Sequence, residues 1–250
     1  MTETKRILSR MPEDLYDKVL SDSKNYTSLS ETVTQALYEK YDPLNYSRLK
    51  SPKGNRYSKG PDSFTARELS IVTGSLLGDG GVYFGPRSQN AYYQEGHGTK
   101  QAAYLKWKEE ELSRFSPSSW TGVHYTSFGD FPYASVYLQA CEAFTYLHNK
   151  WYLDGKKVVP SDLRLDPIMV AVWYMDDGGG AKIHTSGFDP KENIHLAALL
   201  SEFLLCEVNV RTDTRGYEFL YLTKRGQQIL AKKCKPYWHE TMLYKIEDKI

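Results

Sequence analysis

The chain has 250 residues, a formal net charge of +1, 40% apolar residues and three cysteines. This length is enough for one large domain, or for a small and a medium one, with a real apolar core. Three cysteines without a CxxC pair exclude a disulfide framework and a zinc-thiolate site. The longest apolar run is far shorter than the ~20 residues of a membrane helix, and the first ten residues are too polar for a signal peptide. We therefore expect a soluble protein of the cytoplasm or an organellar matrix, not secreted and without membrane contact.

Residues 1–41 predict a small module of one strand and two helices. Residues 5–11 can be extended, Pro12 stands at the start of a first helix, and Ser28-Leu-Ser-Glu31 is a capping box that begins a second. This arrangement resembles ribbon-helix-helix DNA-binding domains, in which two chains pair their strands. The resemblance implies dimerisation through residues 1–41. A helical hairpin that packs on its own chain is the alternative.

Residues 42–63 predict a basic linker, because they lack periodicity and are rich in Pro, Gly, Ser and Asn. Between Asp42 and Asp62 the segment contains several Lys and Arg and no acid. Such a segment can follow a phosphate backbone and become ordered only when bound. We include Arg48, Lys50 and Lys53 among the candidate DNA-binding residues. A solvated tether without a partner is the alternative.

From Thr65 onward, one order of elements is predicted twice. In the first half it is a helix from Thr65 to about Asp79, strands 81–87 and 91–98, a helix 101–115, strands 122–128 and 133–139, and a helix 141–151. In the second half it is a helix 167–177, a strand 181–187, a helix 191–205, strands 207–213 and 218–223, and a helix 226–234. The pattern indicates an internal duplication of roughly 95 residues, with halves at 64–160 and 161–250. The first strand pair is shortened in the second half.

Two of these predicted helices end in the same way. Residues 71–81 read IVTGSLLGDGG and residues 170–180 read VAVWYMDDGGG. Each is an apolar run that ends in an aspartate followed by glycines, which predicts a buried helix with a left-handed glycine cap. An acid at a helix C-terminus faces the negative end of the helix dipole and loses ~0.3–1 kcal/mol. A locally unfavourable feature that occurs twice suggests a function.

The small residues of these helices predict that they pack side by side, through Gly74 and Gly78 in one copy and Ala171 in the other. Asp79 and Asp177 would then lie within a few Å of each other. At about 4 Å, two like charges repel by about 4 kcal/mol at an effective dielectric constant of ~20. A divalent cation removes this repulsion, and oxygen-only ligands suit Mg²⁺. The pattern therefore indicates metal-assisted phosphodiester hydrolysis.

VTGSLLGDG at 72–80 and VAVWYMDDG at 170–178 resemble the two copies of the nine-residue motif of the LAGLIDADG homing endonucleases, in their single-chain form. The resemblance covers about residues 65–250. It implies an α+β fold, a pseudo-twofold duplicated αββαββα arrangement whose two curved antiparallel sheets lie in the DNA major groove. It also implies a core that acts as a monomer and makes a site-specific, metal-dependent double-strand break in DNA.

The aspartate at the eighth position of the family's motif binds metal, and the resemblance carries this role over to Asp79 and Asp177. Two or three Mg²⁺ ions shared between the two aspartates are expected. The preceding residues Gly78 and Asp176 complete the candidate metal-binding set. The motif has alanine in place of Asp176, so the resemblance itself implies no ligand role for this residue.

Two further segments resemble family segments that supply a basic residue to each active site. They are GKKVVP at 155–160 and MLYK at 242–245, and they indicate Lys157 and Lys245 as catalytic residues. Each lysine follows the aspartate of its own half at a comparable distance along the chain. A lysine there can stabilise charge on the transferring phosphate or help to polarise the attacking water. Two ordinary surface lysines are the alternative.

Polar side chains of the predicted strands are candidate contacts to base edges or phosphates. Along strand 207–213, Asn209 and Arg211 alternate with two valines, so the polar set faces outward. The candidate contacts are Arg87, Gln89, Gln94, His124, Ser127, Gln139, Lys182, His184, Asn209, Arg211 and Arg215. Ordinary surface polarity is the alternative for any one of them. The shortened strand pair predicts weaker specificity on the half-site read by the second half.

Two other functions remain open. One lies within the same family, an RNA maturase that assists the splicing of the intron that encodes it. The other is a non-catalytic DNA-binding regulator of the same fold. A regulator has no reason to keep both aspartates and both lysines, and this chain has all four.

Overall fold

The computed structural model describes residues 61–86, 88–126 and 129–246. Contacts divide the chain into the units Met1–Tyr57 and Ser58–Ile250, and the described residues all belong to the second. The predictions for residues 1–41 and for most of the linker therefore lie outside the described residues. The same holds for five candidate DNA contacts, which are Arg48, Lys50, Lys53, Arg87 and Ser127. In the described part of the chain, no helix has the length and the apolar character needed to span a membrane.

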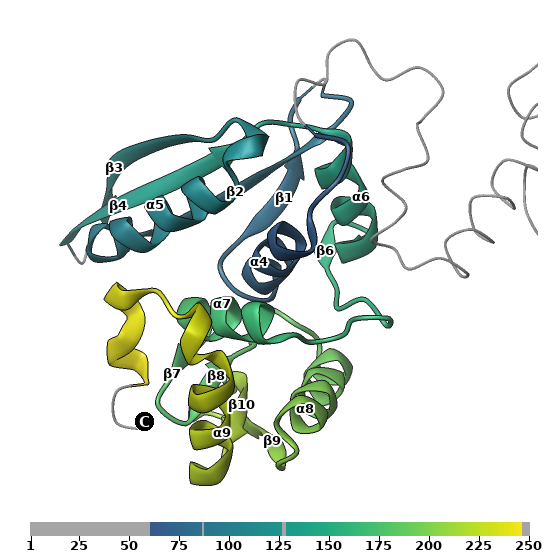
Figure 1. The fold of residues 1–250 in the computed structure, drawn as a ribbon, viewed down its shortest axis with the longest axis vertical. Coiled ribbons are helices and arrows are strands. Elements are labelled where there is room, and N and C mark those ends of the chain that lie inside the picture. The colour runs from purple at the N-terminus through teal and green to yellow at the C-terminus, as the bar shows by residue number, and fades with distance from the viewer. Residues whose placement is uncertain (1–60, 87, 127–128, 247–250) are drawn as a thin grey trace, which may run out of the picture. The chain divides into compact units, whose positions relative to one another are not determined.

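The first half has the predicted order of elements (Figure 1). They are α4 Ala66–Leu77, β1 Gly81–Phe84, β2 Ala91–Gly98, α5 Ala102–Glu111, β3 Ser118–Thr126, β4 Gly129–Leu138 and α6 Glu142–Trp151. The 3-10 turns η3 Thr99–Gln101 and η4 Ser113–Phe115 flank α5. The four strands form one antiparallel sheet in the order β1-β2-β4-β3. Helices α5 and α6 pack against this sheet.

The second half repeats this arrangement. Its elements are α7 Pro167–Asp177, β7 Gly178–Gly179, β8 Lys182–His184, α8 Pro190–Leu204, β9 Val208–Thr212, β10 Glu218–Leu222 and α9 Lys224–Cys234. The sheet order β7-β8-β10-β9 matches that of the first sheet. The predicted α+β fold with two duplicated halves is confirmed. The shortening is also present, since β7 and β8 have two and three residues where β1 and β2 have four and eight.

Five short elements were not predicted, and one of them is strand β7 directly after α7. A hairpin of β5 Tyr152–Leu153 and β6 Lys156–Lys157 follows α6, and the 3-10 helices η5 Lys235–Tyr237 and η6 Glu240–Lys245 follow α9. Strands of two residues have no periodicity to detect. The turn of the hairpin did carry a signal, because Asp154 and Gly155 both have a positive φ, as the Asp-Gly pair of a tight hairpin turn requires.

Helices α4 and α7 begin as predicted but end differently. Thr65 and Glu68 form the capping box of α4. Neither Gly80 nor Gly81, which follow Asp79, has a positive φ, and Gly178 has φ −81°, so the left-handed glycine caps predicted directly after the aspartates are wrong. The reason at the second helix is that Gly178 is already the first residue of β7 and must be extended. Left-handed backbone follows only at Gly180, in the turn to β8, with φ 60°.

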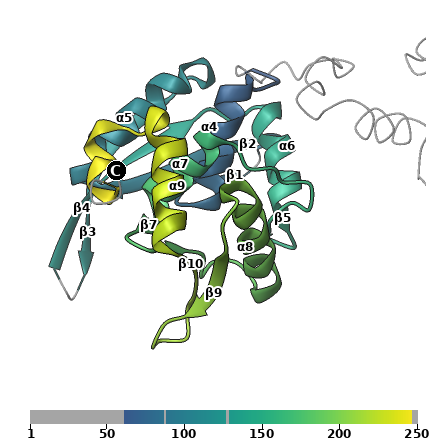
Figure 2. The same cartoon turned by 60° about the horizontal axis from the view of Figure 1, so that its bottom comes forward.

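The two motif helices lie side by side with very close backbones (Figures 1 and 2). A Cβ atom added at Gly74 would lie 2.6 Å from the carbonyl oxygen of Met169 and 2.8 Å from Cβ of Val172. One added at Gly78 would lie 2.5 Å from Cβ of Asp176. The predicted close packing is therefore present, and it brings the C-terminal ends of the two helices together. One continuous apolar core contains residues of both halves.

This packing gives a testable expectation for Gly74→Ala. Alanine favours a helix by about 1 kcal/mol over glycine, but here its methyl group meets a backbone oxygen that cannot move away. We expect the free energy of unfolding to fall by about 1–3 kcal/mol in urea denaturation. Gly98→Ala is the matched control, because nothing lies within 4 Å of an added Cβ and its φ is −58°. Equal stability of the two variants would contradict the close packing.

Candidate functional site

The structure brings the two predicted aspartates to one place, at the ends of α4 and α7. Asp177 is the last residue of α7, and Asp79 follows α4 by two residues with its side chain 41% exposed. Burial, together with the carboxylates of Asp79 and Asp176, raises the pKa of Asp177 to about 7. The two predicted ligands therefore lie close enough to repel each other.

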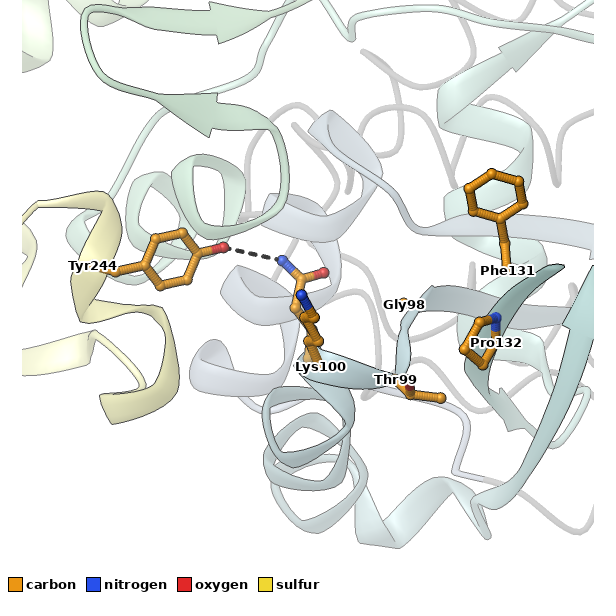
Figure 3. Close-up of a pocket in the computed structure, with 7 residues that line it drawn as sticks. Gly98, Thr99, Lys100, Phe131, Pro132 and Tyr244 are labelled. Carbon is orange, nitrogen blue, oxygen red and sulfur yellow. Dashed lines mark hydrogen bonds between the residues drawn. The ribbon is translucent and has the colours of Figure 1, made fainter. Parts of the chain in front are cut away.

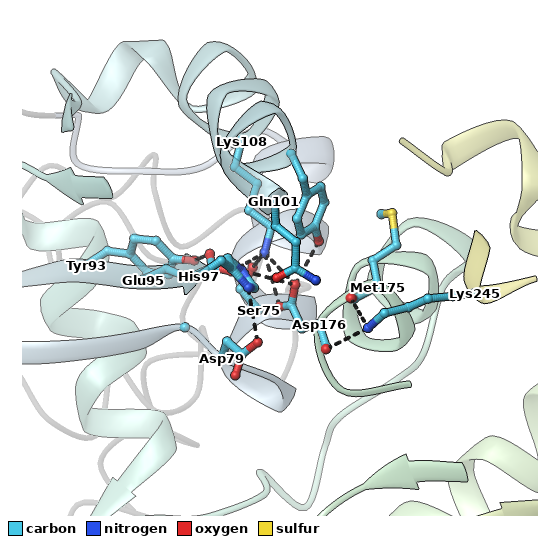
Figure 4. Close-up of polar contacts among 12 residues, drawn as sticks. Ser75, Asp79, Tyr93, Glu95, His97, Gln101, Lys108, Met175, Asp176 and Lys245 are labelled. Carbon is cyan, nitrogen blue, oxygen red and sulfur yellow. Dashed lines mark hydrogen bonds and ion pairs between the residues drawn. The ribbon is translucent and has the colours of Figure 1, made fainter. Parts of the chain in front are cut away.

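Both predicted lysines lie beside the motif of their own half. Lys157 Nζ donates to the carbonyl oxygen of Gly80 at 2.7 Å, one residue after Asp79. Lys245 Nζ donates to the carbonyl oxygens of Met175 at 2.6 Å and Asp176 at 3.0 Å (Figure 4). An ammonium at these last carbonyls offsets the unfavourable acid at the end of α7.

The pKa values of these two lysines are also shifted. Burial lowers the pKa of Lys157 and that of Lys245, and neighbouring carboxylates, including Asp79 and Asp177, oppose this effect. Each half of the chain thus supplies one carboxylate and one half-buried ammonium group to the same region. This is the pseudo-twofold arrangement expected from the duplication.

The carboxylates fit a divalent cation. Asp79 and Asp177 converge, and the nearby lysines donate to backbone oxygens instead of pairing with Asp177. Within residues 61–86, 88–126 and 129–246, Asp177 takes part in no ion pair. Converging carboxylates, of which Asp177 has no direct counter-charge and Asp79 is open to solvent, are a donor set that hard cations such as Mg²⁺ accept.

A buried polar cluster underlies this site and was not predicted. Lys108 Nζ, on α5, lies 2.8 Å from Ser75 Oγ, 2.9 Å from Asp176 Oδ1 and 3.1 Å from Asp176 Oδ2, and it also pairs with Glu95. Tyr104 donates to Asp176 Oδ1 at 2.8 Å. The side chains of Lys108, Glu95 and Asp176 are fully buried. The cluster joins β2 and α5 of the first half to α7 of the second (Figure 4).

Lys108 and Glu95 hold each other in the charged form. Burial lowers the pKa of Lys108, but Asp176 and Glu95 outweigh burial and raise it. Burial raises the pKa of Glu95, but Lys108 and His97 outweigh burial and lower it. Burial raises the pKa of Asp176 to about 6, although Lys108 opposes this rise. Both carboxylate oxygens of Asp176 therefore already bind a cation of the chain itself, the ammonium group of Lys108.

A signal for this cluster was present in the sequence. Lys108 shares a helix face with Tyr104 and Leu112, and a charged residue on an apolar face is rare unless it is paired. Tyr93, Glu95 and His97 stand at every second position of β2, and all three are buried. Neither the helix periodicity of Lys108 nor the alternation along β2 shows which residues these side chains pair with.

The outward face of the first sheet is aromatic. Because Tyr93 and Glu95 of β2 point toward the helices, Tyr92 and Gln94 point to the other side. The strand register places Tyr83, Tyr92, Gln94, Trp120, His124, Phe131, Tyr133 and Tyr137 on that side. No Lys or Arg occupies this face at any position that the structure describes. Of the predicted contacts, Gln94 and His124 lie on it, whereas Gln89 and Gln139 lie in loops beyond the strands.

The outward face of the second sheet carries the cations. Lys182 and His184 of β8 lie in register with Tyr221 and Phe219 of β10, which pair with Asn209 and Arg211 of β9. The four predicted contacts Lys182, His184, Asn209 and Arg211 therefore share one face. Lys182 Nζ lies 4.5 Å from the ring centroid of Phe219, and the guanidinium of Arg211 lies 3.5 Å from that of Tyr221. Arg215 lies in the β9–β10 turn and pairs with Asp213.

A pocket of about 590 Å³ opens near the site, between the end of β2, strand β4 and η6 (Figure 3). It is lined by Gly98, Thr99, Lys100, Gln101, Phe131, Pro132 and Tyr244. Gln101 Nε2 donates to the hydroxyl of Tyr244 at 3.3 Å across its wall. Lys100 is the charged residue of this lining, and it is a candidate phosphate contact that the sequence did not indicate.

The raised pKa of Asp177 predicts how stability depends on pH. The folded chain holds this proton more tightly than the unfolded chain, so the stabilising effect of protonation is lost as pH rises from about 4 to about 7. Without metal, we expect the free energy of unfolding to fall over this window, by at most about 4 kcal/mol from Asp177. Urea unfolding in EDTA at pH 4 and pH 8 measures it. If Asp177→Asn shows the same fall, the expectation is wrong.

Comparison with known proteins identifies the class. The model of the LAGLIDADG DNA endonuclease family matches residues 69–230, which contain both nine-residue motifs and both sheets. The chain belongs to this family.

The individual proteins that resemble this chain carry different names. Cytochrome b mRNA maturase bI2 of Debaryomyces hansenii is 29% identical over 198 residues, covering 71% of this chain and 72% of the relative. Protein RecA of Mycolicibacterium chitae is 33% identical over 208 residues, covering 74% of this chain but only 48% of that protein. Among solved structures, the homing endonuclease I-WcaI bound to its DNA recognition sequence has a TM-score of 0.68 at 19% identity, covering 73% of this chain and 86% of that one.

Proposed function

We propose that the chain is a site-specific DNA endonuclease that makes a double-strand break by metal-dependent phosphodiester hydrolysis. The observation that carries this proposal is the doubled set of groups at the ends of α4 and α7, one carboxylate and one half-buried lysine from each half. A duplex has two strands of opposite direction, and two related half-sites suit the cleavage of both.

In this proposal Asp79 and Asp177 hold divalent cations, for which we expect Mg²⁺. A bound cation would activate water and neutralise the oxygens of the scissile phosphate. Lys157 and Lys245 are held in place by the backbone oxygens of Gly80, Met175 and Asp176. Their ammonium groups can stabilise the charge that develops on the transferring phosphate. Gly78 and Asp176 stay candidates for the metal site, although Lys108 and Tyr104 occupy oxygens of Asp176.

Duplex DNA would lie against the outward faces of the two sheets. Lys182 and Arg211 are suited to phosphates and guanine edges, and Gln94 and Asn209 to base edges. The hairpins β3–β4 and β9–β10 extend toward the same side of the unit, as Figure 2 shows. The similarity in fold to the I-WcaI complex supports this placement.

Cleavage of a randomised duplex library with Mg²⁺, read by sequencing the ends, tests the proposal. We expect paired ends at one preferred sequence, and none in EDTA. Ends without sequence preference, or no cleavage with any of Mg²⁺, Mn²⁺ and Co²⁺, would contradict it.

An RNA maturase is the second candidate function, and one observation favours it. The aromatic, uncharged face of the first sheet suits unpaired bases, which stack on such side chains in RNA recognition. The relative from D. hansenii is itself named an mRNA maturase. If the chain is a maturase, adding it should accelerate splicing of its own host intron in vitro. No change in the splicing rate would exclude this candidate.

A further inference from the structure

His97 lies between a buried carboxylate and the exposed Asp79. Its Nε2 is 2.6 Å from Glu95 Oε1, and its Nδ1 is 3.4 Å from Asp79 Oδ2 (Figure 4). The side chain of Glu95 is fully buried and paired with Lys108. An ionised carboxylate is only an acceptor, so Nε2 of His97 carries the proton that this hydrogen bond needs.

This assignment leaves Nδ1 as the nitrogen that faces Asp79. In a neutral imidazole only one nitrogen bears a proton, so Nδ1 then has a lone pair directed toward Asp79. A carboxylate that accepts from one nitrogen while the other binds a metal is the usual outer-shell arrangement of a metal-bound histidine. Two ligand atoms at right angles, each about 2.2 Å from an ion, lie about 3.1 Å apart. The 3.4 Å between Nδ1 and Oδ2 is close to this separation.

Asp176 is not part of this pair, although it could complete a metal-binding group with Asp79 and His97. Its Oδ1 is 3.8 Å from Nε2, the nitrogen that is committed to Glu95. Lys108 and Tyr104 already bind that oxygen. The group of Asp79, His97 and Asp176 is the one such group in the described part of the chain, and Asp177 has no histidine in an equivalent place.

We propose that His97 Nδ1 is a ligand of the divalent cation held by Asp79, with Glu95 as the acceptor that orients the ring. This inference rests on the metal site of the proposed function. The cation at Asp79 then has a nitrogen ligand, which favours transition-metal ions over Mg²⁺, whereas the one at Asp177 has oxygen ligands. Where His97 is protonated beforehand, binding releases the Nδ1 proton to solvent.

Cobalt(II) is the probe, added as its chloride to the full chain without DNA. High-spin Co²⁺ shifts the proton NMR signals of its ligands far outside the normal range. We expect one shifted, exchangeable signal from the Nε2 proton of His97, visible in H₂O and lost in D₂O. It should split in protein labelled with ¹⁵N-histidine, disappear in His97→Gln and persist in His195→Gln, a histidine on α8 outside the site.

Calorimetric titration separates this inference from the proposed function. We expect His97→Gln to weaken Co²⁺ binding at least about tenfold and Mg²⁺ binding much less, with an unchanged circular dichroism spectrum. Bound Co²⁺ without a histidine signal in the wild-type chain overturns the inference and leaves the proposed function intact. Equal losses for Co²⁺ and Mg²⁺ also overturn it, since they indicate a structural role. No binding of either ion overturns both.

Discussion

Asp177→Asn is expected to abolish double-strand cleavage while leaving DNA binding largely intact. Asparagine keeps the size of the side chain and one oxygen, but it removes the charge that would hold a cation at the end of α7. The loss of cleavage rate should be at least about 10³-fold, as when a group that stabilises the transition state is removed. Asp79→Asn should have the same effect, because each half supplies one carboxylate. Linearisation of a plasmid that carries the target measures cleavage, and anisotropy with Ca²⁺ measures binding.

Asp162→Asn is the matched control for both variants. Asp162 is 49% exposed and pairs with Lys150 at the surface, away from the motif helices. The Asp162→Asn variant should cleave at the wild-type rate. Full cutting by Asp79→Asn or by Asp177→Asn would refute the assignment of these residues, and a parallel loss of DNA binding would show that the substitution disturbs the fold.

Lys108→Met is expected to cost about 3–5 kcal/mol of stability, because it leaves Glu95 and Asp176 buried without their cation. Lys106→Met on the same helix is the control. Lys106 is 60% exposed and forms only a surface pair with Glu109, so its loss should change stability by less than about 1 kcal/mol. Urea denaturation of both variants measures the difference.

Removing the partners together should recover much of the loss. When Lys108→Met is combined with Glu95→Gln and Asp176→Asn, no charge of the cluster remains buried, and replacing a whole buried ion cluster is often nearly neutral. If Lys108→Met is no less stable than Lys106→Met, the ammonium group is not what neutralises these two carboxylates.

The sequence predicted the framework of the site because its signals are local. Each motif helix is a continuous apolar run with small residues and a terminal aspartate, and the duplication predicted that the two runs meet. The glycine caps were wrong, since the turn that needs a positive φ comes at Gly180 instead of directly after the helix. A local sequence pattern does not show that the chain passes from α7 directly into the extended strand β7, without a left-handed residue between them.

The buried cluster could not be predicted because its partners are distant in sequence. Lys108 meets Glu95 and Asp176 across separations of 13 and 68 residues, from three different elements. Periodicity places Lys108 on an apolar face but does not say which carboxylates neutralise it. Lys157 and Lys245 are likewise far from the residues that hold them, and only the family resemblance indicated their positions.

The difference between the outward faces of the two sheets has a consequence for how DNA is released. Affinity that comes from Lys and Arg contacts to phosphate is driven by counterion release, and it falls steeply as salt rises. Lys182 and Arg211 lie on the second sheet, whereas the described part of the first sheet offers aromatic rings, whose contacts are insensitive to salt. Rising ionic strength should therefore loosen the half-site on the second sheet first. The shorter sheet, which has less strand to read sequence with, would then act as the salt-dependent end of the complex.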